Sequence, residues 1–200
     1  MKRADHTKQL LLEAASRAFY QHGVASTGLR AIESLTGLTK GSIYGHFGSK
    51  ENLIREAFAW QLKRLNQQLV HLTHKRTGFT ARLLTLFDFL LQNIESGEFP
   101  AGCPLMKIAT ELRISQPEMA EELLQPAFES WQKRLVFHVE EGQLVGEINA
   151  TLDAERFANW LICQYEGAAA FHLIRQSPAA TKALANDIKN TARYKIALKN

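Results

Sequence analysis

Residues 23–50 read GVASTGLRAIESLTGLTKGSIYGHFGSK and carry the signals of two short helices separated by a tight turn. Thr27 can cap a first helix that begins within the next two residues, and Thr39 can cap a second that runs to about His46. Between the two helices, Gly37 supplies the left-handed backbone conformation that a sharp reversal requires. The stretch therefore predicts a compact unit of helix, turn and helix.

The second of these helices has two different faces. Ile43 and Phe47, at i and i+4, form its apolar face. The other side chains are a cation, a hydroxyl, a phenol and an imidazole, supplied by Lys40, Ser42, Tyr44 and His46. All four groups can bond to phosphate oxygens or base edges. The arrangement predicts a helix-turn-helix whose second helix enters the major groove of DNA.

Positive charge is concentrated in the same part of the chain. Residues 1–50 contain seven Lys or Arg and three acidic residues, whereas residues 51–200 contain 17 of each sign. The formal net charge of +4 therefore lies on the segment with the helix-turn-helix. Such a distribution is typical of a phosphate-facing module attached to a neutral body. The alternative is that this excess is ordinary surface chemistry.

The remaining sequence predicts helices and no sheet. Apolar residues recur at helical spacing in several further stretches, and no stretch alternates with period two for long enough to demand a strand. The predicted helices are residues 7–22, 50–75, 79–94, 105–113, 117–143, 154–175 and 178–199. Pro126 should kink the helix that contains it. We therefore expect an all-α protein of about nine helices.

Composition argues against several other classes of protein. Hydrophobic residues make up 46% of the 200 residues, which is enough to fill a core. No apolar run approaches the ~18 residues of a membrane helix, and the first residues lack a signal-peptide cleavage site. Cys103 and Cys163 lie far apart without metal-ligand spacing, so no disulfide framework is expected. We predict a cytoplasmic protein with no membrane partner.

Enzymatic and metal chemistry are not supported by the motifs. The sequence shows no nucleophile and base pair, no phosphate loop and no metal-ligand set. His71 and His74 lie at i and i+3 of a predicted helix, but no third ligand is in register. The prediction is a protein that is not an enzyme and needs no metal or cofactor.

A longer pattern runs through the helix-turn-helix. It reads Thr27-x-x-Arg30-x-Ile32, then Gly37-Leu38-Thr39-Lys40-Gly41-Ser42-Ile43-Tyr44-x-His46-Phe47-x-Ser49-Lys50-Glu51-x-Leu53. This pattern resembles the DNA-binding domain of the TetR family of one-component repressors, and the resemblance is dense over residues 7–60. It implies a homodimer that binds a palindromic operator and is released by an effector.

The resemblance also implies a division of labour along the chain. Residues 1–50 would form a three-helix DNA-binding head, and residues 51–200 a helical domain for effector binding and dimerisation. The helix that begins at Lys50 would link them. At ~1.5 Å per residue that helix is about 40 Å long, which is enough to reach a second layer of helices.

Nine residues of the head are expected at the DNA. They are Thr27, Arg30, Thr39, Lys40, Gly41, Ser42, Tyr44, His46 and Lys50. Thr27 and Lys50 are predicted to hold phosphates at helix N-termini. Arg30 and residues 40–42 are the candidates for base edges, and Arg30 could make a bidentate contact with guanine.

Tyr44 and His46 match positions that touch the DNA backbone in the family that the chain resembles. The alternative for both is packing against the first helix. Two residues depart from the pattern: Glu33 stands where a small residue is usual, and Gly45 where a bulkier one is common. Gly45 should weaken its helix by ~0.5 to 1 kcal/mol relative to alanine.

The last two long helices carry broad apolar surfaces and are the expected dimer interface. A run of small residues at 167–170 would let another backbone approach closely. The predicted interface residues are Phe157, Trp160, Leu161, Gln164, Tyr165, Ala168, Leu184 and Ile188. The family resemblance implies a four-helix bundle made from these two helices of each subunit. The alternative is that this face packs only within its own chain.

The effector is far less visible in the sequence. The tentative pocket residues are Trp60, Phe87, Cys103, Met106, Phe128, Trp131, Trp160 and Phe171. The alternative for the aromatic members is ordinary core packing. Cys103 precedes a short helix with Lys107 one turn on, a setting that favours the thiolate. It also resembles the cysteine of a family branch that answers reactive electrophiles; the alternative is a small structural thiol. Cys163 is predicted to be core.

Two classes of function therefore remain. The preferred one is a dimeric repressor in which the effector changes operator affinity through its different affinity for two states. The alternative is a helical small-molecule binding protein or enzyme with a vestigial DNA-binding head. A steep loss of DNA affinity with salt and a strong preference over random DNA are expected only of the repressor.

Overall fold

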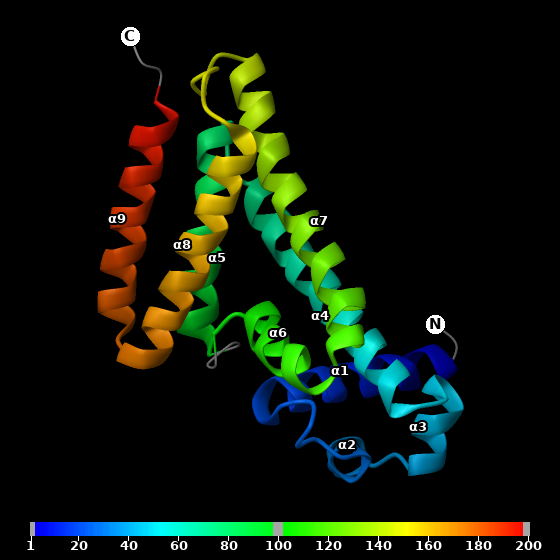
Figure 1. Ribbon diagram of the computed structural model, residues 1–200. Coiled ribbons are helices and arrows are strands. Elements are labelled where there is room, and N and C mark those ends of the chain that lie inside the picture. The colour runs from blue at the N-terminus through cyan, green and yellow to red at the C-terminus, as the bar shows by residue number, and fades with distance from the viewer. Residues whose placement is uncertain (1–2, 98–101, 198–200) are drawn as a thin grey trace. The chain divides into compact units, whose positions relative to one another are not determined.

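The computed structural model describes residues 3–97 and 102–197, and within these ranges every regular element is an α-helix. The helices, shown in Figure 1, are α1 (Arg3–His22), α2 (Leu29–Thr36), α3 (Lys40–Phe47), α4 (Lys50–His74), α5 (Phe79–Ser96), α6 (Pro104–Ser115), α7 (Pro117–Leu144), α8 (Ala154–Arg175) and α9 (Pro178–Ile196). The predicted all-α fold with nine helices is confirmed for the described residues. None of these helices is long and apolar enough to cross a membrane.

The helix boundaries follow the capping residues closely. Thr39 caps α3 as predicted, since its side chain accepts a hydrogen bond from the Ser42 amide. Asp153 and Ser177 cap α8 and α9 in the same way. α1 begins earlier than predicted, at Arg3, because no breaker stands before Thr7. Residues 98–101 of the predicted break after α5 and 198–199 of the predicted last helix lie outside the described residues.

The contacts group the chain into two compact units. The first comprises Met1–Asn66 and Pro104–Gln125, and the second comprises Gln67–Cys103 and Pro126–Asn200. One boundary thus falls within α7 at Pro126, a residue that cannot donate the i to i−4 backbone hydrogen bond. The head packs with α6 and the start of α7, so the compact units do not divide at residue 50. The division of function at residue 50 remains a prediction.

The first unit has a core built on α1. Fully buried side chains from its helices meet there: Leu11, Ala15, Ala18, Ile32, Ile43, Leu53 and Ala57. The Ser16 hydroxyl donates to the Ala57 carbonyl at 2.8 Å and ties α1 to α4. Since α2 and α3 are each only eight residues long, they depend on this packing rather than on their own propensity.

The second unit is organised around α5. This helix is buried on most of its circumference, with Leu83, Leu84, Leu86, Phe87, Phe89 and Leu90 in the core. It contacts both α8 and α9, and α8 and α9 also lie side by side (Figure 1). A helix that is apolar nearly all round is stable only when other helices cover it, so α5 forms the centre of this unit.

Candidate nucleic-acid interface and effector region

The turn between α2 and α3 has the geometry that the glycine predicted. Gly37 has φ +69° and its N–H donates to the Glu33 carbonyl at 2.8 Å, which closes α2. Ile32 and Ile43 are 0% and 1% exposed, so the inner faces of both helices are fixed on the core. The opposite face of α3 is thereby held outward.

A carboxylate connects the two helices. Glu33 in α2 accepts a hydrogen bond from the backbone N–H of Lys40, the first residue of α3, at 2.5 Å. That amide has no partner within its own helix, and a negative charge near a helix N-terminus is favourable. Glu33, which departs from the family pattern, therefore helps to set the position of α3 relative to α2.

The outward face of α3 is available to a partner. Lys40, Gly41 and Tyr44 are exposed, and the Lys40 ammonium lies 5.7 Å from the centre of the Tyr44 ring. Arg30 in α2 is also exposed, and neither Arg30 nor Lys40 forms an ion pair with any described residue. Cations without a carboxylate partner can bind phosphates or bases.

Ser42 and His46, on the same helix, are half-buried. Their side chains lie at the edge of the outward face. Thr39 is exposed, and its hydroxyl accepts the Ser42 amide at 3.3 Å, so this residue serves the helix first. The structure thus brings Arg30, Thr39, Lys40 and the residues up to His46 into two consecutive short helices and the turn between them.

The prediction for Thr27 is wrong. This residue is 1% exposed, and its hydroxyl donates to the Gly23 carbonyl at 2.6 Å within the α1 to α2 connection. Gly28, and not Thr27, is the N-cap of α2, and it makes no side-chain hydrogen bond. A buried hydroxyl committed to its own backbone cannot clamp a phosphate, so Thr27 is a structural residue.

Lys50 also has an internal partner. Its ammonium donates to the Val24 carbonyl at 3.1 Å and joins the start of α4 to the α1 to α2 connection. Lys50 is half-buried, and an ammonium has three donors. Two donors remain for a phosphate, so the predicted contact stays a prediction.

Glu111 in α6 is a residue of the first unit that the sequence did not single out for a role. Its carboxylate accepts from the Ala25 amide at 2.6 Å, 86 residues away in sequence. A Cβ at Gly23, where φ is +87°, would lie only 3.0 Å from the same carboxylate, so this position needs glycine. Lys107, one turn earlier, lies 5.7 Å from the Tyr20 ring centre. α6 is thus attached to the loop that precedes α2.

The candidate effector residues divide between the two units. Trp60 and Met106 belong to the first unit, and Met106 is 46% exposed. In the second unit, Phe87 is fully buried, so its core alternative holds, whereas Phe128 is 39% exposed. The others, all half-buried, are Cys103, Trp131, Trp160 and Phe171. The structure does not gather all eight residues in one unit.

The second unit contains buried side-chain polar atoms without a hydrogen-bond partner among the described residues. They include Oε1 of Glu166 and Nε1 of Trp131, whose ring packs edge-on against Tyr165 at 5.3 Å. Burial raises the pKa of Glu166 to about 7, against the opposing effect of a hydrogen bond from Cys103. Cys103 thus meets a carboxylate, whereas Lys107, expected to assist it, lies over Tyr20 in the first unit.

The predicted dimer residues face two ways. Five of them have almost no surface left for a partner, because each is at most 6% exposed within its own chain: Phe157, Leu161, Tyr165, Ala168 and Ile188. The remaining three are half-buried: Trp160, Gln164 and Leu184. For the buried five the prediction took the wrong face, since a broad apolar stripe marks the core side of a helix first.

The exposed face of α8 carries a different set of residues. At spacings of three and four lie Asn159, Cys163, Gly167, Ala170 and Ile174. The sequence predicts Cys163 in the core, and its exposure corrects that prediction. Among the described residues no group of three or more His, Cys, Asp or Glu is arranged to hold a metal ion.

The head consists of α1, α2 and α3. Because α3 is capped and turns an exposed, cationic face outward, α2 and α3 define a helix-turn-helix DNA-binding module. The helical unit around α5 would then be the regulatory part. Comparison with known proteins agrees. Residues 11–57 match the family described as bacterial regulatory proteins, tetR family, and residues 80–188 match the tetracyclin repressor-like C-terminal domain. The chain belongs to the TetR family of transcriptional regulators.

Individual relatives show how this similarity is distributed. The regulator TtgR of Pseudomonas putida is 48% identical over 52 residues, which is 26% of this chain and 25% of TtgR. The repressor DhaR of a Mycobacterium species is 26% identical over 165 residues, covering 80% of this chain and 79% of DhaR. The chain therefore matches only about a quarter of the length of TtgR.

The fold is shared along the whole chain. The crystal structure of a TetR-family transcriptional regulator from Cytophaga hutchinsonii has a TM-score of 0.89 and 25% identity, covering 100% of this chain and 99% of that one. Family models match both residues 11–57 and residues 80–188, so the similarity is not confined to the head.

Proposed function

We propose that the protein is a homodimeric repressor that binds a palindromic operator in the cytoplasm and is released by an effector acting on its second unit. The outward face of α3, with Lys40 exposed beside Tyr44, carries the proposal. One short helix reads too few bases to be specific, so two copies are required. The protein acts by binding and catalyses no reaction.

The proposed DNA contacts are assigned to residues of the head whose side chains are exposed or half-buried. Arg30 and residues 40–42 are proposed to meet base edges, and Tyr44, His46 and Lys50 to meet the backbone. Thr27 is excluded because it is buried. Lys40 combines a charge with an aromatic neighbour, and an exposed lysine held in this way loses less side-chain entropy when it binds.

The dimer interface is proposed on the exposed face of α8 with α9. Gly167 and Ala170 expose little side chain, so a second helix can approach closely there. Trp160, Gln164 and Leu184, which are half-buried, would lie at the edge of this contact. A free thiol at Cys163 gives a direct probe of the interface, because dimerisation should protect it from alkylation.

Cys103 is proposed as a sensor of soft electrophiles. Its thiol is half-buried and hydrogen-bonded to the Glu166 carboxylate, which can accept the thiol proton. The sulfur would then add to an activated C=C bond, with the C–S bond forming as the π bond breaks and a proton going to the neighbouring carbon. The alternative is a structural thiol that closes the turn before α6.

The sensor has a direct test. N-ethylmaleimide should release operator DNA from the native protein and from Cys163→Ser, and should leave Cys103→Ser bound. Equal release from Cys103→Ser and the native protein would remove Cys103 from the proposal. If the native protein and Cys163→Ser stay bound to DNA although Cys103 is alkylated, Cys103 has only a structural role.

The repressor proposal is tested by DNA binding as a function of salt. Affinity for the DNA upstream of the gene should fall steeply with salt and exceed that for random DNA. Lys40→Ala and Arg30→Ala should each cost about 1 to 3 kcal/mol at one base pair and relax specificity there. Lys63→Ala, an exposed lysine of α4, is the matched control and should change neither affinity nor specificity.

A shallow salt slope with no preference over random DNA would support the alternative, a binding protein or enzyme with a vestigial head. Unchanged footprints for both Arg30→Ala and Lys40→Ala would remove the base-reading assignment while leaving the family membership intact.

A further inference from the structure

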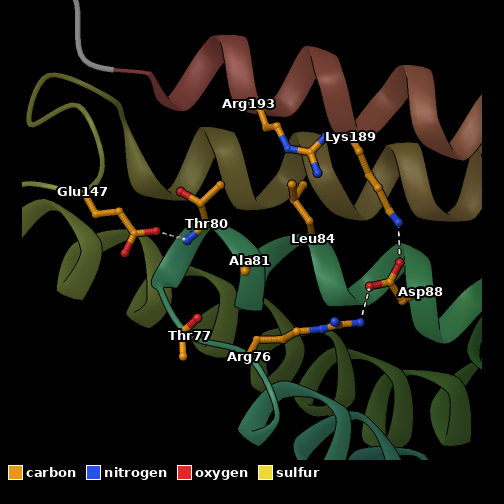
Figure 2. A pocket seen from close by; sticks show the side chains of 9 residues that line it. All are labelled: Arg76, Thr77, Thr80, Ala81, Leu84, Asp88, Glu147, Lys189 and Arg193. Atoms are coloured by element: carbon orange, nitrogen blue, oxygen red, sulfur yellow. Dashed lines mark hydrogen bonds and ion pairs between the residues drawn. The ribbon is translucent and has the colours of Figure 1, made fainter.

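A groove of about 310 Å³ lies between α5 and α9 in the second unit, and no role proposed above uses it. Figure 2 shows the side chains that line it: Arg76, Thr77, Thr80, Ala81, Leu84, Asp88, Glu147, Lys189 and Arg193. Ala81 and Leu84 give it an apolar floor, while charged groups form the walls. A volume near 300 Å³ is at the lower end of small-molecule sites.

The two carboxylates of the groove are already engaged. Asp88 is ion-paired with Arg76, at 2.9 Å, and with Lys189, whose side chain is only 13% exposed. Glu147 accepts hydrogen bonds from the backbone amides of Phe79 and Thr80, both at 2.8 Å. Both acids therefore already have protein partners and offer little to a cation.

The charge state of Glu147 supports this description. Burial acts to raise the pKa of its carboxyl group, but the hydrogen bonds from Thr80 and from the Phe79 amide, together with the positive charge of Arg82, lower the pKa overall. The carboxylate is therefore ionised and works as an internal anion at the N-terminus of α5. The groove thus already binds one carboxylate, that of Glu147, through the first amides of α5.

The cations are not equally engaged. Arg193, on α9, donates to the Asn190 side-chain oxygen at 2.9 Å and forms no ion pair with a described residue. A guanidinium has five donors, so four remain. Arg76 is 44% exposed and shares the Asp88 carboxylate with Lys189. Three cations against two occupied carboxylates leave unbalanced positive charge at the rim.

From this arrangement we propose that the groove between α5 and α9 binds a small organic anion, with a carboxylate or phosphate group on Arg193 and Arg76 and an apolar part on Ala81 and Leu84. Lys189, held by Asp88, adds long-range attraction rather than a direct bond. The site stands apart from DNA binding and from Cys103, so the proposal does not depend on the proposed function.

The experiment titrates the purified full-length protein with succinate and, separately, with inorganic phosphate at constant ionic strength, followed by calorimetry. Saturable binding is expected in the native protein. Arg193→Gln should weaken it by about tenfold or more, the equivalent of losing a charge-assisted hydrogen bond. Arg175→Gln, which removes an exposed arginine of α8 outside the groove, should bind as the native protein does.

Stronger binding of succinate than phosphate, or the reverse, identifies the anionic group and supports the site in either case. Equal affinities in all three proteins, no saturable binding of either anion, or saturable binding of tetramethylammonium instead would overturn the proposal. Thermal unfolding without added anion should be the same for Arg193→Gln and Arg175→Gln, so that a folding defect is not mistaken for a lost site.

Discussion

The head and the unit around α5 are each stabilised by a different kind of contact. In the head, residues close in sequence fix α3: Thr39 caps it, Gly37 turns the chain before it, and Glu33 supports its first amide. In the second unit, α5 depends on residues far along the chain, such as Glu147 and Lys189. Local rules therefore specify the proposed reading surface, and non-local packing specifies the proposed regulatory unit.

The largest effect is expected in the core of the second unit. Phe87→Ala should lower the free energy of unfolding by roughly 3 to 5 kcal/mol, because Phe87 is 0% exposed and a cavity would remain. Phe128→Ala, at a side chain that is 39% exposed, should cost much less. Urea unfolding measures both. If both variants lose similarly little unfolding free energy and Phe87→Ala no longer responds to the effector, Phe87 lines the effector pocket instead.

The next effect depends on pH. The pKa of Glu166 is raised to about 7 in the folded chain, above its unfolded value of 4.5, so the folded state holds more protons between these values. Stability should therefore fall as pH rises through this window, by up to about 3 kcal/mol. Glu166→Gln should flatten the profile, and the exposed Glu140→Gln should not. Parallel profiles for all three proteins would contradict the raised pKa of Glu166.

A smaller effect tests the long-range contact between α6 and the head. Glu111→Ala should destabilise the protein by about 1 to 2 kcal/mol, because the Ala25 amide loses a charged acceptor. Glu121→Ala breaks only the exposed pair with Arg113 and should cost about 0 to 1 kcal/mol. Chemical unfolding of the two variants compares them directly. Equal losses would mean that α6 does not support the head through this bond.

The smallest effect concerns glycines at α3. Gly45→Ala should raise stability by about 0.5 to 1 kcal/mol, since no atom lies within 4 Å of the added Cβ. Gly48→Ala should lower it, because Gly48 has φ +74°. Thermal unfolding separates the two. If Gly45→Ala is stable but binds operator more weakly, DNA approaches the helix backbone at that position.

The extent of successful prediction follows the same division. Thr39, Asp153 and Ser177 are predictable as helix caps because a cap acts over three residues, and the structure confirms them. The roles of Glu111 and Glu166 could not be predicted. The partner of Glu111 is 86 residues away in sequence, and the raised pKa of Glu166 arises only from burial in the folded chain. No local pattern marks such partners.

The same limit explains the errors. Thr27 has the residue type of a cap, but its hydroxyl turns back to the Gly23 carbonyl. On α8, helical spacing separates two faces without saying which one the chain itself covers. Sequence reasoning therefore assigns Phe157 to a partner and Cys163 to the core, and the structure reverses both.

The contact between Glu147 and the first amides of α5 has a consequence for synthesis on the ribosome. Glu147 follows Phe79 by 68 residues and Thr80 by 67 residues. The helix α5 therefore leaves the exit tunnel long before the carboxylate that binds its first amides. Its apolar surface stays uncovered for longer still, because α8 and α9, which contact α5, follow Glu147 in the chain. A nascent chain that pauses before α8 is therefore expected to need a chaperone.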